Sequence, residues 1–305
     1  MEKIIEISNL TKTYKNLTAV NNLSLNVFKG DVFGFLGPNG AGKSTTIRML
    51  LTLIKPTNGE IKIFDKNLNT NRNEILKKIG AIVEKPDFYG YLTAFKNLEI
   101  LGKISGCDVS KNKIMGILDL VGLKSRFNSK VKTFSHGMKQ RLGIAQALLH
   151  DPELIILDEP TTGLDPQGMK EIRDLITLLS KEKNKTIFLS SHILYEVELV
   201  ANRMVIINKG ATKVEGYVND LLNAANLKVT VGFNPNEFIK SIINESLWQK
   251  NIDSITDSKI IFNLTSDQIP DLNKYLVQHD IEVNSIVPMR SLEEYFLDIT
   301  EKSAS

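Results

Sequence analysis

Residues 37–45 read GPNGAGKST, a stretch that fits the pattern G-x-x-x-x-G-K-[ST]. The apolar run DVFGFLG at 31–37 precedes it and predicts a strand that is buried on both faces. The segment at 43–55 follows it and predicts a helix that ends at Lys55, before Pro56. A glycine-rich loop between a strand and a helix directs backbone amides and the helix N-terminus at one anion. The stretch therefore predicts a phosphate-binding site.

Each residue of this loop has a predicted part in nucleotide binding. The glycines allow the tight turns that point backbone amides at phosphate oxygens. Lys43 is predicted to reach the β- and γ-phosphates of ATP, and Ser44 to bind Mg²⁺ through its hydroxyl. The nucleotide-binding residues predicted in the loop are Gly37, Pro38, Asn39, Gly40, Ala41, Gly42, Lys43, Ser44 and Thr45.

A pair of carboxylates, Asp158 and Glu159, closes the apolar stretch ELIILDEP at 153–160. In open α/β sheets, ligands gather at the carboxyl ends of the strands, so this pair is expected beside the phosphate loop. Asp158 is predicted to hold Mg²⁺. Glu159 is predicted to orient or deprotonate the water that attacks the γ-phosphate. Loop and carboxylates together predict an ATPase.

Strand-like and helix-like segments alternate over the first 220 residues, which predicts an α/β fold with a mostly parallel sheet covered by helices. The predicted strands include 21–31, 31–37, 153–160 and 185–192, and the predicted helices include 43–55, 111–123 and 168–182. Residues 221–305 follow a different order, β-α-β-β-α-β-α, which predicts a small ferredoxin-like accessory domain without a catalytic constellation. These elements are predicted at 227–233, 236–244, 247–255, 258–265, 268–280, 281–288 and 291–300.

The bulk composition excludes several classes of protein. The 305 residues carry a net charge of only +3, and scattered lysines give no nucleic-acid footprint. The single cysteine, Cys107, permits no internal disulfide and fits a reducing compartment. No run approaches the roughly 20 apolar residues that span a bilayer, so direct membrane insertion is not expected.

The segment GAIVEKPDFYG at 80–90 begins as an apolar strand and breaks at Glu84. Pro86 cannot continue a central strand, so Glu84 is predicted to lie at a strand end. A carboxylate there is either a solvated strand end or a further group of the active site, and this stretch alone leaves both readings open.

Three further stretches resemble motifs of the ATP-binding cassette (ABC) family. FSHGMKQRLGIAQALL at 134–149 is similar to its signature motif, TTGLDP at 161–166 to its D-loop, and SSH at 190–192 to its switch-histidine segment. With the phosphate loop and the Asp158–Glu159 strand, at least five ordered motifs carry the resemblance over residues 2–215. It implies a P-loop NTPase of the ABC type, with antiparallel β and helical subdomains beside the mostly parallel sheet.

The resemblance implies a dimer of two cassettes that face each other head to tail. Ser135 and Gly137 of one copy would then close on the γ-phosphate bound by loop 37–45 of the other, with the helix N-terminus favouring the anion. His136 and Met138 stand where the commonest form of the motif, L-S-G-G-Q, has Gly and Gln.

The remaining site residues follow from the same resemblance. Tyr14 resembles the aromatic residue that stacks on adenine, and Asp165 the residue that links the two copies. His192 resembles the γ-phosphate sensor. Glu84 stands where most cassettes have a Gln that touches Mg²⁺ and the attacking water. The implied catalytic residues are Glu159, His192 and Glu84.

A subgroup resemblance rests on the segment EKPDFYGYLTAFKNL at 84–98 and on the ending SLEEYFLDIT at 291–300. Both are similar to ATPases that export bacitracin and lantibiotic peptides or confer immunity to them. This implies a separate integral membrane permease as partner, and a peripheral position at the cytoplasmic face of the cell membrane.

Three alternatives belong to other classes. A cassette protein of translation usually carries two phosphate loops, and this chain has one. A chromosome or repair ATPase needs a long coiled coil between Lys43 and Ser135, where no heptads are sustained. A soluble ABC ATPase that serves a non-transport assembly or regulatory complex is left open by the sequence.

Overall fold

The structure, a computed structural model, describes residues 2–223, 227–234, 239–290 and 296. The chain divides into two compact units, Met1–Gly216 and Tyr217–Ser305. Each unit has a hydrophobic core of its own. The change of element order predicts a domain boundary at residue 220. The observed division lies a few residues before it.

A six-stranded sheet runs through the first unit in the order β10-β9-β3-β8-β7-β6. Its strands are β3 (Val32–Leu36), β6 (Ile79–Ile82), β7 (Leu154–Leu157), β8 (Thr186–Ser191), β9 (Arg203–Asn208) and β10 (Ala211–Tyr217). The pairs from β9 through β3, β8 and β7 to β6 are parallel. Every residue of β3 and β7 is buried, as expected for apolar strands covered on both faces. The predicted mostly parallel sheet is confirmed.

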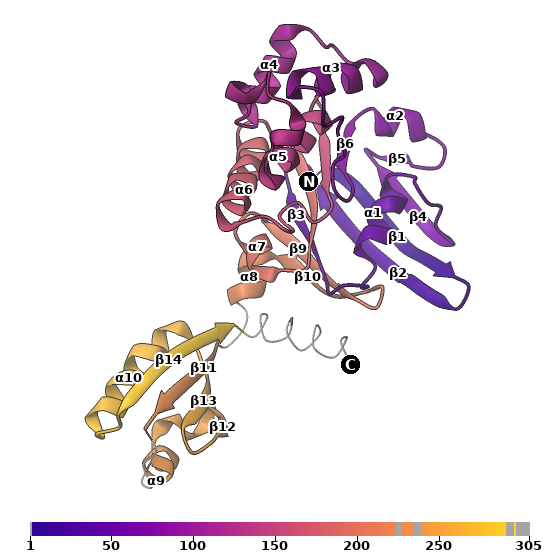
Figure 1. The fold of residues 1–305 in the computed structure, drawn as a ribbon. Helices are drawn as coiled ribbons and strands as arrows, with labels where there is room; N and C mark the ends of the chain where they lie inside the picture. Colours follow the sequence, from indigo (N-terminus) through magenta and orange to yellow (C-terminus); the bar gives the residue numbers. More distant parts are fainter. Residues whose placement is uncertain (1, 224–226, 235–238, 291–295, 297–305) are drawn as a thin grey trace. The chain divides into compact units, whose positions relative to one another are not determined.

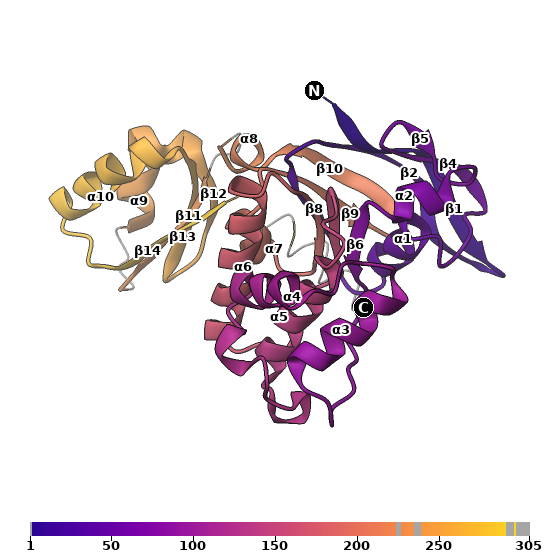
Figure 2. The same ribbon diagram turned by 90° about the horizontal axis from the view of Figure 1, so that it is seen from above.

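A second, antiparallel sheet completes this unit in the order β2-β1-β4-β5. Its strands are β1 (Lys3–Tyr14), β2 (Leu17–Phe28), β4 (Asn58–Ile63) and β5 (Lys66–Asn67). In Figures 1 and 2 these strands lie on the opposite side of the unit from α5 and α6. Ile47 and Met49 of α1 share one buried cluster with residues of both sheets, such as Val20 and Phe33. The helix that follows the phosphate loop is thus held by both sheets.

Seven helices are described in the first unit: α1 (Lys43–Leu50), α2 (Arg72–Leu76), α3 (Ala94–Ile104), α4 (Lys111–Leu120), α5 (His136–Ala147), α6 (Pro166–Lys181) and α7 (Leu194–Glu198). Helices α3, α4 and α5 form the helical subdomain that the resemblance implied (Figure 1). Thr93, Ser110 and Ser135 cap their N-termini by accepting hydrogen bonds from backbone amides three residues on.

The predicted end of the helix after the phosphate loop was wrong. Helix α1 ends at Leu50 and does not reach Lys55. Thr52 has a φ of 58°, and the amides of Leu53 and Ile54 both donate to the carbonyl of Arg48, at 2.8 and 3.3 Å. This left-handed turn satisfies the last carbonyls of the helix before the chain reaches Pro56.

The second unit contains an antiparallel sheet in the order β12-β13-β11-β14. Its elements are α8 (Val218–Asn223), β11 (Leu227–Phe233), α9 (Ile239–Asn244), β12 (Ile252–Ile255), β13 (Lys259–Leu264), α10 (Ile269–Gln278) and β14 (Val283–Arg290). The split β-α-β-β-α-β order is that of a ferredoxin-like sheet. The strand predicted at 247–255 forms only at β12, because Leu247–Asn251 is a 3₁₀ turn. The helix predicted at 291–300 lies outside the described residues except for Phe296.

Candidate active site

The phosphate loop occupies the turn between β3 and α1. Gly40 and Gly42 have φ angles of 79° and 106°, in the left-handed region that favours glycine. A Cβ added at Gly37 or Gly42 would lie 2.5 Å from the nearest backbone oxygen, so the loop has no room for a larger residue at either position. Gly42 caps α1 without a side-chain hydrogen bond, which leaves the first amides of the helix for an anion.

Lys43 folds back across this loop. Its Nζ donates to the carbonyls of Gly37 and Pro38, at 2.7 and 3.1 Å, and lies 3.3 Å from Glu159 Oε1. Burial lowers the pKa of Lys43 below its ordinary value, although the charges of Glu159 and Asp158 oppose the shift. The cation is therefore enclosed by the loop that is expected to hold phosphate.

Asp158 and Glu159 follow β7 and share one support in the neighbouring strand β8. The hydroxyl of Ser190 donates to Asp158 Oδ1 at 2.5 Å and accepts from the Glu159 amide at 2.9 Å. Asp158 is 5% exposed and Ser190 is fully buried. Glu159 has a φ of 49°, so the backbone turns sharply between the two carboxylates. The single hydroxyl thus holds both residues at the end of the sheet.

The Glu159 carboxylate is surrounded by cations and donors. Lys43 lies at one oxygen, while His192 Nδ1 and the Thr162 hydroxyl lie 3.1 and 3.0 Å from the other. Burial by itself would raise the pKa of Glu159, but the nearby charges of Lys43 and His192 and the Thr162 hydrogen bond outweigh it. The pKa of Glu159 is consequently lowered, and the residue is a carboxylate at neutral pH.

Glu84 lies two residues after the end of β6, in the left-handed conformation with a φ of 65°. Its side chain is 65% exposed and forms an ion pair with Arg48 of α1. Strand β6 therefore ends two residues before the predicted position, and the Glu84 side chain is exposed. It nevertheless lines the cavity in which the other groups meet.

This cavity, of about 230 Å³, brings together polar side chains from four separate segments of the chain. The lining residues are Ser44, Glu84, Lys85, His136, Gln140, Asp158, Glu159 and Thr162. Ser44, Asp158 and Glu84, the three predicted metal-binding residues, are all among them. Sequence positions between 44 and 162 thus converge on one small volume at the carboxyl ends of β6 and β7.

Several predicted residues lie outside this lining, among them Tyr14, Ser135, Gly137 and Asp165. Tyr14 ends β1 and is 44% exposed, with Lys12 Nζ 4.8 Å from the centre of its ring. Ser135 caps α5 by accepting from the Met138 amide at 3.2 Å, and Gly137 follows in the first turn of that helix. Asp165 caps α6, accepting from the Gly168 amide at 2.8 Å.

Three residues of the site were missed by sequence reasoning. The Ser190 hydroxyl donates to the Asp158 carboxylate and accepts from the Glu159 amide, and the Thr162 hydroxyl donates to the Glu159 carboxylate. Arg48 binds Glu84. A signal was present for Ser190, because a hydroxyl in an otherwise apolar buried strand requires a hydrogen-bond partner. Arg48 lies on an exposed helix surface, which contains no such signal.

The donor set fits an ATP-bound Mg²⁺ ion. The Ser44 hydroxyl and the carboxylates of Asp158 and Glu84 are the hard oxygen ligands that this ion prefers. Among the described residues, no group of three or more His, Cys, Asp or Glu side chains could hold a metal alone. That agrees with Mg²⁺ chemistry, in which one or two carboxylates act together with substrate phosphates and waters.

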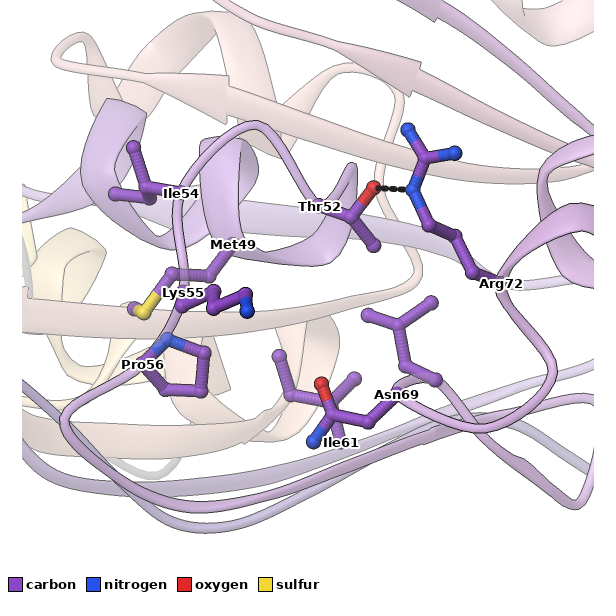
Figure 3. Close-up of a pocket in the computed structure, with 9 residues that line it drawn as sticks. Met49, Thr52, Ile54, Lys55, Pro56, Ile61, Asn69 and Arg72 are labelled. Carbon is purple, nitrogen blue, oxygen red and sulfur yellow. Dashed lines mark hydrogen bonds between the residues drawn. The ribbon is translucent and has the colours of Figure 1, made fainter.

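A second cavity, of about 150 Å³, opens beside the C-terminal end of α1. Figure 3 shows Met49, Pro56 and Ile61 around it, with Arg72 Nε donating to the Thr52 hydroxyl at 2.6 Å. No carboxylate is among its lining residues, and none of these residues lines the first cavity. This cavity is therefore separate from the acidic centre.

A phosphate loop, a buried lysine and a carboxylate pair at the end of a parallel sheet define a P-loop nucleoside-triphosphate hydrolase. The ABC transporter family matches residues 20–162. Curated relatives extend the match to nearly the whole chain. The chain therefore belongs to the ABC transporter family of ATP-binding proteins. The predicted ATP-hydrolysing transporter subunit is thereby confirmed.

Among curated relatives, the chain is 47% identical to the bacitracin transport ATP-binding protein BcrA of Bacillus licheniformis, over 98% of each chain. It is 39% identical to the BcrA protein of Enterococcus faecalis, over 97% of this chain and 96% of that one. The lantibiotic transport ATP-binding protein SrtF of Streptococcus pyogenes is 44% identical over 70% of this chain and 90% of its own.

Solved structures of ATP-binding cassettes share the fold. One is a dimer in a post-hydrolysis state bound to ADP and Pi, with 30% identity and a TM-score of 0.63, covering 70% of this chain and 99% of its own. Another is the ATP-binding subunit of an ABC transporter, with 31% identity and a TM-score of 0.62, covering 72% and 91%. Within the described residues, no helix combines the length and apolarity that crossing a membrane requires.

Proposed function

We propose that this chain drives the export of a peptide antibiotic, of the bacitracin or lantibiotic kind, through a separate membrane permease. The observation that carries the proposal is the 47% identity to a bacitracin transport ATP-binding protein over 98% of both chains. That match includes the second unit, whereas the solved cassettes cover about 70% of the chain. A non-transport assembly role is not favoured, because no relative named above carries one.

The proposed chemistry begins with ATP on the phosphate loop. Loop amides and the N-terminus of α1 bind its phosphates, Lys43 moves from the loop carbonyls to the β- and γ-phosphates, and Tyr14 stacks on adenine. Bound Mg²⁺, held by Ser44, Asp158 and Glu84, would neutralise charge that develops on the phosphate oxygens.

Glu159 is proposed as the general base. An ordinary glutamate is already ionised at neutral pH, so Glu159 can take a proton from water as the water oxygen bonds to the γ-phosphorus. The bond from that phosphorus to the β–γ bridging oxygen breaks, and ADP leaves with the bond electrons. His192 lies beside Glu159 and donates a hydrogen bond to the γ-phosphate.

Two copies are proposed to act as a head-to-tail homodimer. A solved cassette of the same fold is a dimer bound to ADP and Pi, which supports the pairing of two copies. Ser135 and Gly137 lie at the N-terminus of α5, where amides favour an anion, whereas His136 and Gln140 of the same helix line the cavity. They would complete the site of the other copy, and Asp165 would link the two copies.

The proposed docking surface for the permease is the segment after Glu84. Tyr89 and Tyr91 are 47% and 68% exposed, and their ring centroids lie 6.0 Å apart. Buried Asn97 accepts from the Tyr89 amide and donates to its carbonyl, at 2.9 and 3.1 Å, which fixes the segment on α3. Exposed aromatic side chains on a rigid support suit a protein interface. The chain would therefore lie at the cytoplasmic face of the membrane.

The test is purification of the tagged chain from detergent-solubilised membranes, followed by growth in bacitracin or a lantibiotic. An integral membrane protein with several apolar spans of about 20 residues should accompany the wild-type chain. The double variant Tyr89→Ala, Tyr91→Ala should bind ATP normally but lose this partner. Expression of the pair should raise the tolerated antibiotic concentration, and Glu159→Gln should abolish the rise. If neither the partner nor the resistance is observed, the proposed export is wrong.

Residues 221–305, which make up most of the second unit, are proposed to be an accessory domain that takes no part in the chemistry. Its buried cluster consists of its own residues, such as Val229, Phe262 and Leu272. A chain of residues 1–217, which keeps β10 complete, should bind ATP within about threefold of the full chain, because separate cores fold independently. Fluorescent-nucleotide titration measures this. A truncated chain that is folded by circular dichroism but binds at least tenfold more weakly would contradict the boundary.

A further inference from the structure

We propose that Arg48 is a positioning residue that holds Glu84 away from the metal position until the metal–nucleotide complex binds. The proposal rests on the function proposed above, in which Glu84 is a metal ligand, and it concerns how that ligand is controlled. The chemistry proposed above does not use Arg48, and this inference gives that residue a role.

The geometry places two alternative partners for Glu84 on one face of one helix. Ser44 and Arg48 both belong to α1 and are four residues apart, so their side chains lie about one turn, or ~6 Å, from each other on the same face. The Glu84 carboxylate is paired with Arg48 and lines the cavity that contains Ser44 and Asp158. It can therefore exchange the guanidinium for a metal ion at Ser44 by moving along the helix by about one turn.

The backbone on both sides of Glu84 is anchored, so the exchange requires only side-chain rotation. On one side, the Ile82 carbonyl accepts from the Asp158 amide at 2.9 Å. On the other, Pro86 packs so tightly on α5 that a Cβ at Gly143 would lie 2.9 Å from its ring. Between these anchors Glu84 keeps a left-handed φ of 65°, a conformation that costs free energy and recurs at switch residues.

The charges explain why a restraint is useful. The cavity is lined by three carboxylates, those of Glu84, Asp158 and Glu159. The negative charges of Asp158 and Glu159 repel the carboxylate of Glu84. Lys43 forms an ion pair with Glu159, whereas Arg48 forms one with Glu84. Arg48 thus neutralises the most exposed of the three carboxylates in the absence of nucleotide. A divalent cation on ATP phosphates supplies the charge that draws Glu84 away from it.

An exposed ion pair holds its partners weakly, which suits an exchange. The Arg48 and Glu84 side chains are 40% and 65% exposed, and such pairs change an equilibrium by at most about fivefold. When only a fraction of the carboxylate is free, the apparent metal affinity is reduced by that fraction. Removing Arg48 should therefore strengthen metal binding, in contrast to the weakening expected from the loss of a structural residue.

The experiment measures Mn²⁺ binding by electron paramagnetic resonance, on the full chain with a non-hydrolysable ATP analogue. Arg48→Met should lower the Mn²⁺ dissociation constant about two- to fivefold, and Arg48→Lys should leave it near the wild-type value. In a Glu84→Gln chain the same Arg48→Met change should have no effect, since the amide has no charge to hold. Lys66→Met, which breaks a similarly exposed pair with Glu74 elsewhere, is the matched control.

The outcomes separate this inference from the proposed function. An equal effect of Arg48→Met in the wild-type and Glu84→Gln backgrounds, or no effect in either, would overturn the positioning role while leaving the ATPase assignment intact. Failure of every chain, wild type included, to bind Mn²⁺ with the ATP analogue would overturn the proposed metal site itself. The expected difference should also shrink at about 1 M salt, where charges are screened beyond ~3 Å.

Discussion

Replacing Glu159 by Gln is expected to slow ATP hydrolysis about 10²–10⁴-fold while ATP binding is retained. The amide is nearly isosteric with the carboxylate, and the loop, Lys43 and the Asp158–Ser190 pair remain in place. What is lost is the group that we propose accepts the proton of the attacking water. Because hydrolysis would no longer release the closed state, an ATP-bound dimer should accumulate. Single-turnover kinetics and size-exclusion chromatography with ATP measure the two effects.

The matched control is Glu153→Gln, at the other end of the same strand segment. Glu153 forms a surface pair with Lys78 at 2.8 Å and is 48% exposed, so its loss should leave the rate unchanged. A Glu159→Gln chain that hydrolyses ATP within about threefold of wild type would remove Glu159 from the role of general base. A chain that fails to bind ATP would instead indicate that the carboxylate holds Lys43 in place.

A mixture of two inactive variants is expected to regain activity. Lys43→Ala removes the cation of the phosphate loop, and Ser135→Asp places a negative charge where the partner copy's γ-phosphate is expected. Aspartate caps a helix as well as serine does, so α5 should keep the hydrogen bond that Ser135 accepts from Met138. In a head-to-tail heterodimer, one composite site then carries both changes and the other carries neither.

The size of the recovery follows from the symmetry of the dimer. Random pairing of equal amounts makes about half of the dimers mixed, each with one intact site of two, so about a quarter of wild-type activity is expected. Each variant alone should show close to none. Steady-state ATPase assays of the mixture and of its two components decide the matter. A mixture as inactive as its components would count against shared sites, provided that both chains are folded and the Ser135→Asp chain still binds ATP.

The phosphate loop and the order of strands and helices in the first unit could be predicted because their determinants are local. The spacing of Gly37, Gly42 and Lys43, and the apolar runs of β3 and β7, are properties of consecutive residues. The end of α1 was misjudged because Pro56 was taken as the stop. The left-handed turn at Thr52, four residues earlier, has no glycine or asparagine to signal it.

By itself, the sequence determined which chemical groups this protein possesses: a glycine-rich loop with its lysine and serine, a carboxylate pair after an apolar strand, and a glutamate at residue 84. Only the tertiary structure decided which partners those groups have. Ser190 supports Asp158 from 32 residues away, and Arg48 holds Glu84 from 36 residues away. Such contacts depend on the order in which parallel strands pair and on the face that α1 turns toward the loop after β6. Neither is contained in the spacing of residues along the chain, because strands that are neighbours in the sheet are joined by long crossovers.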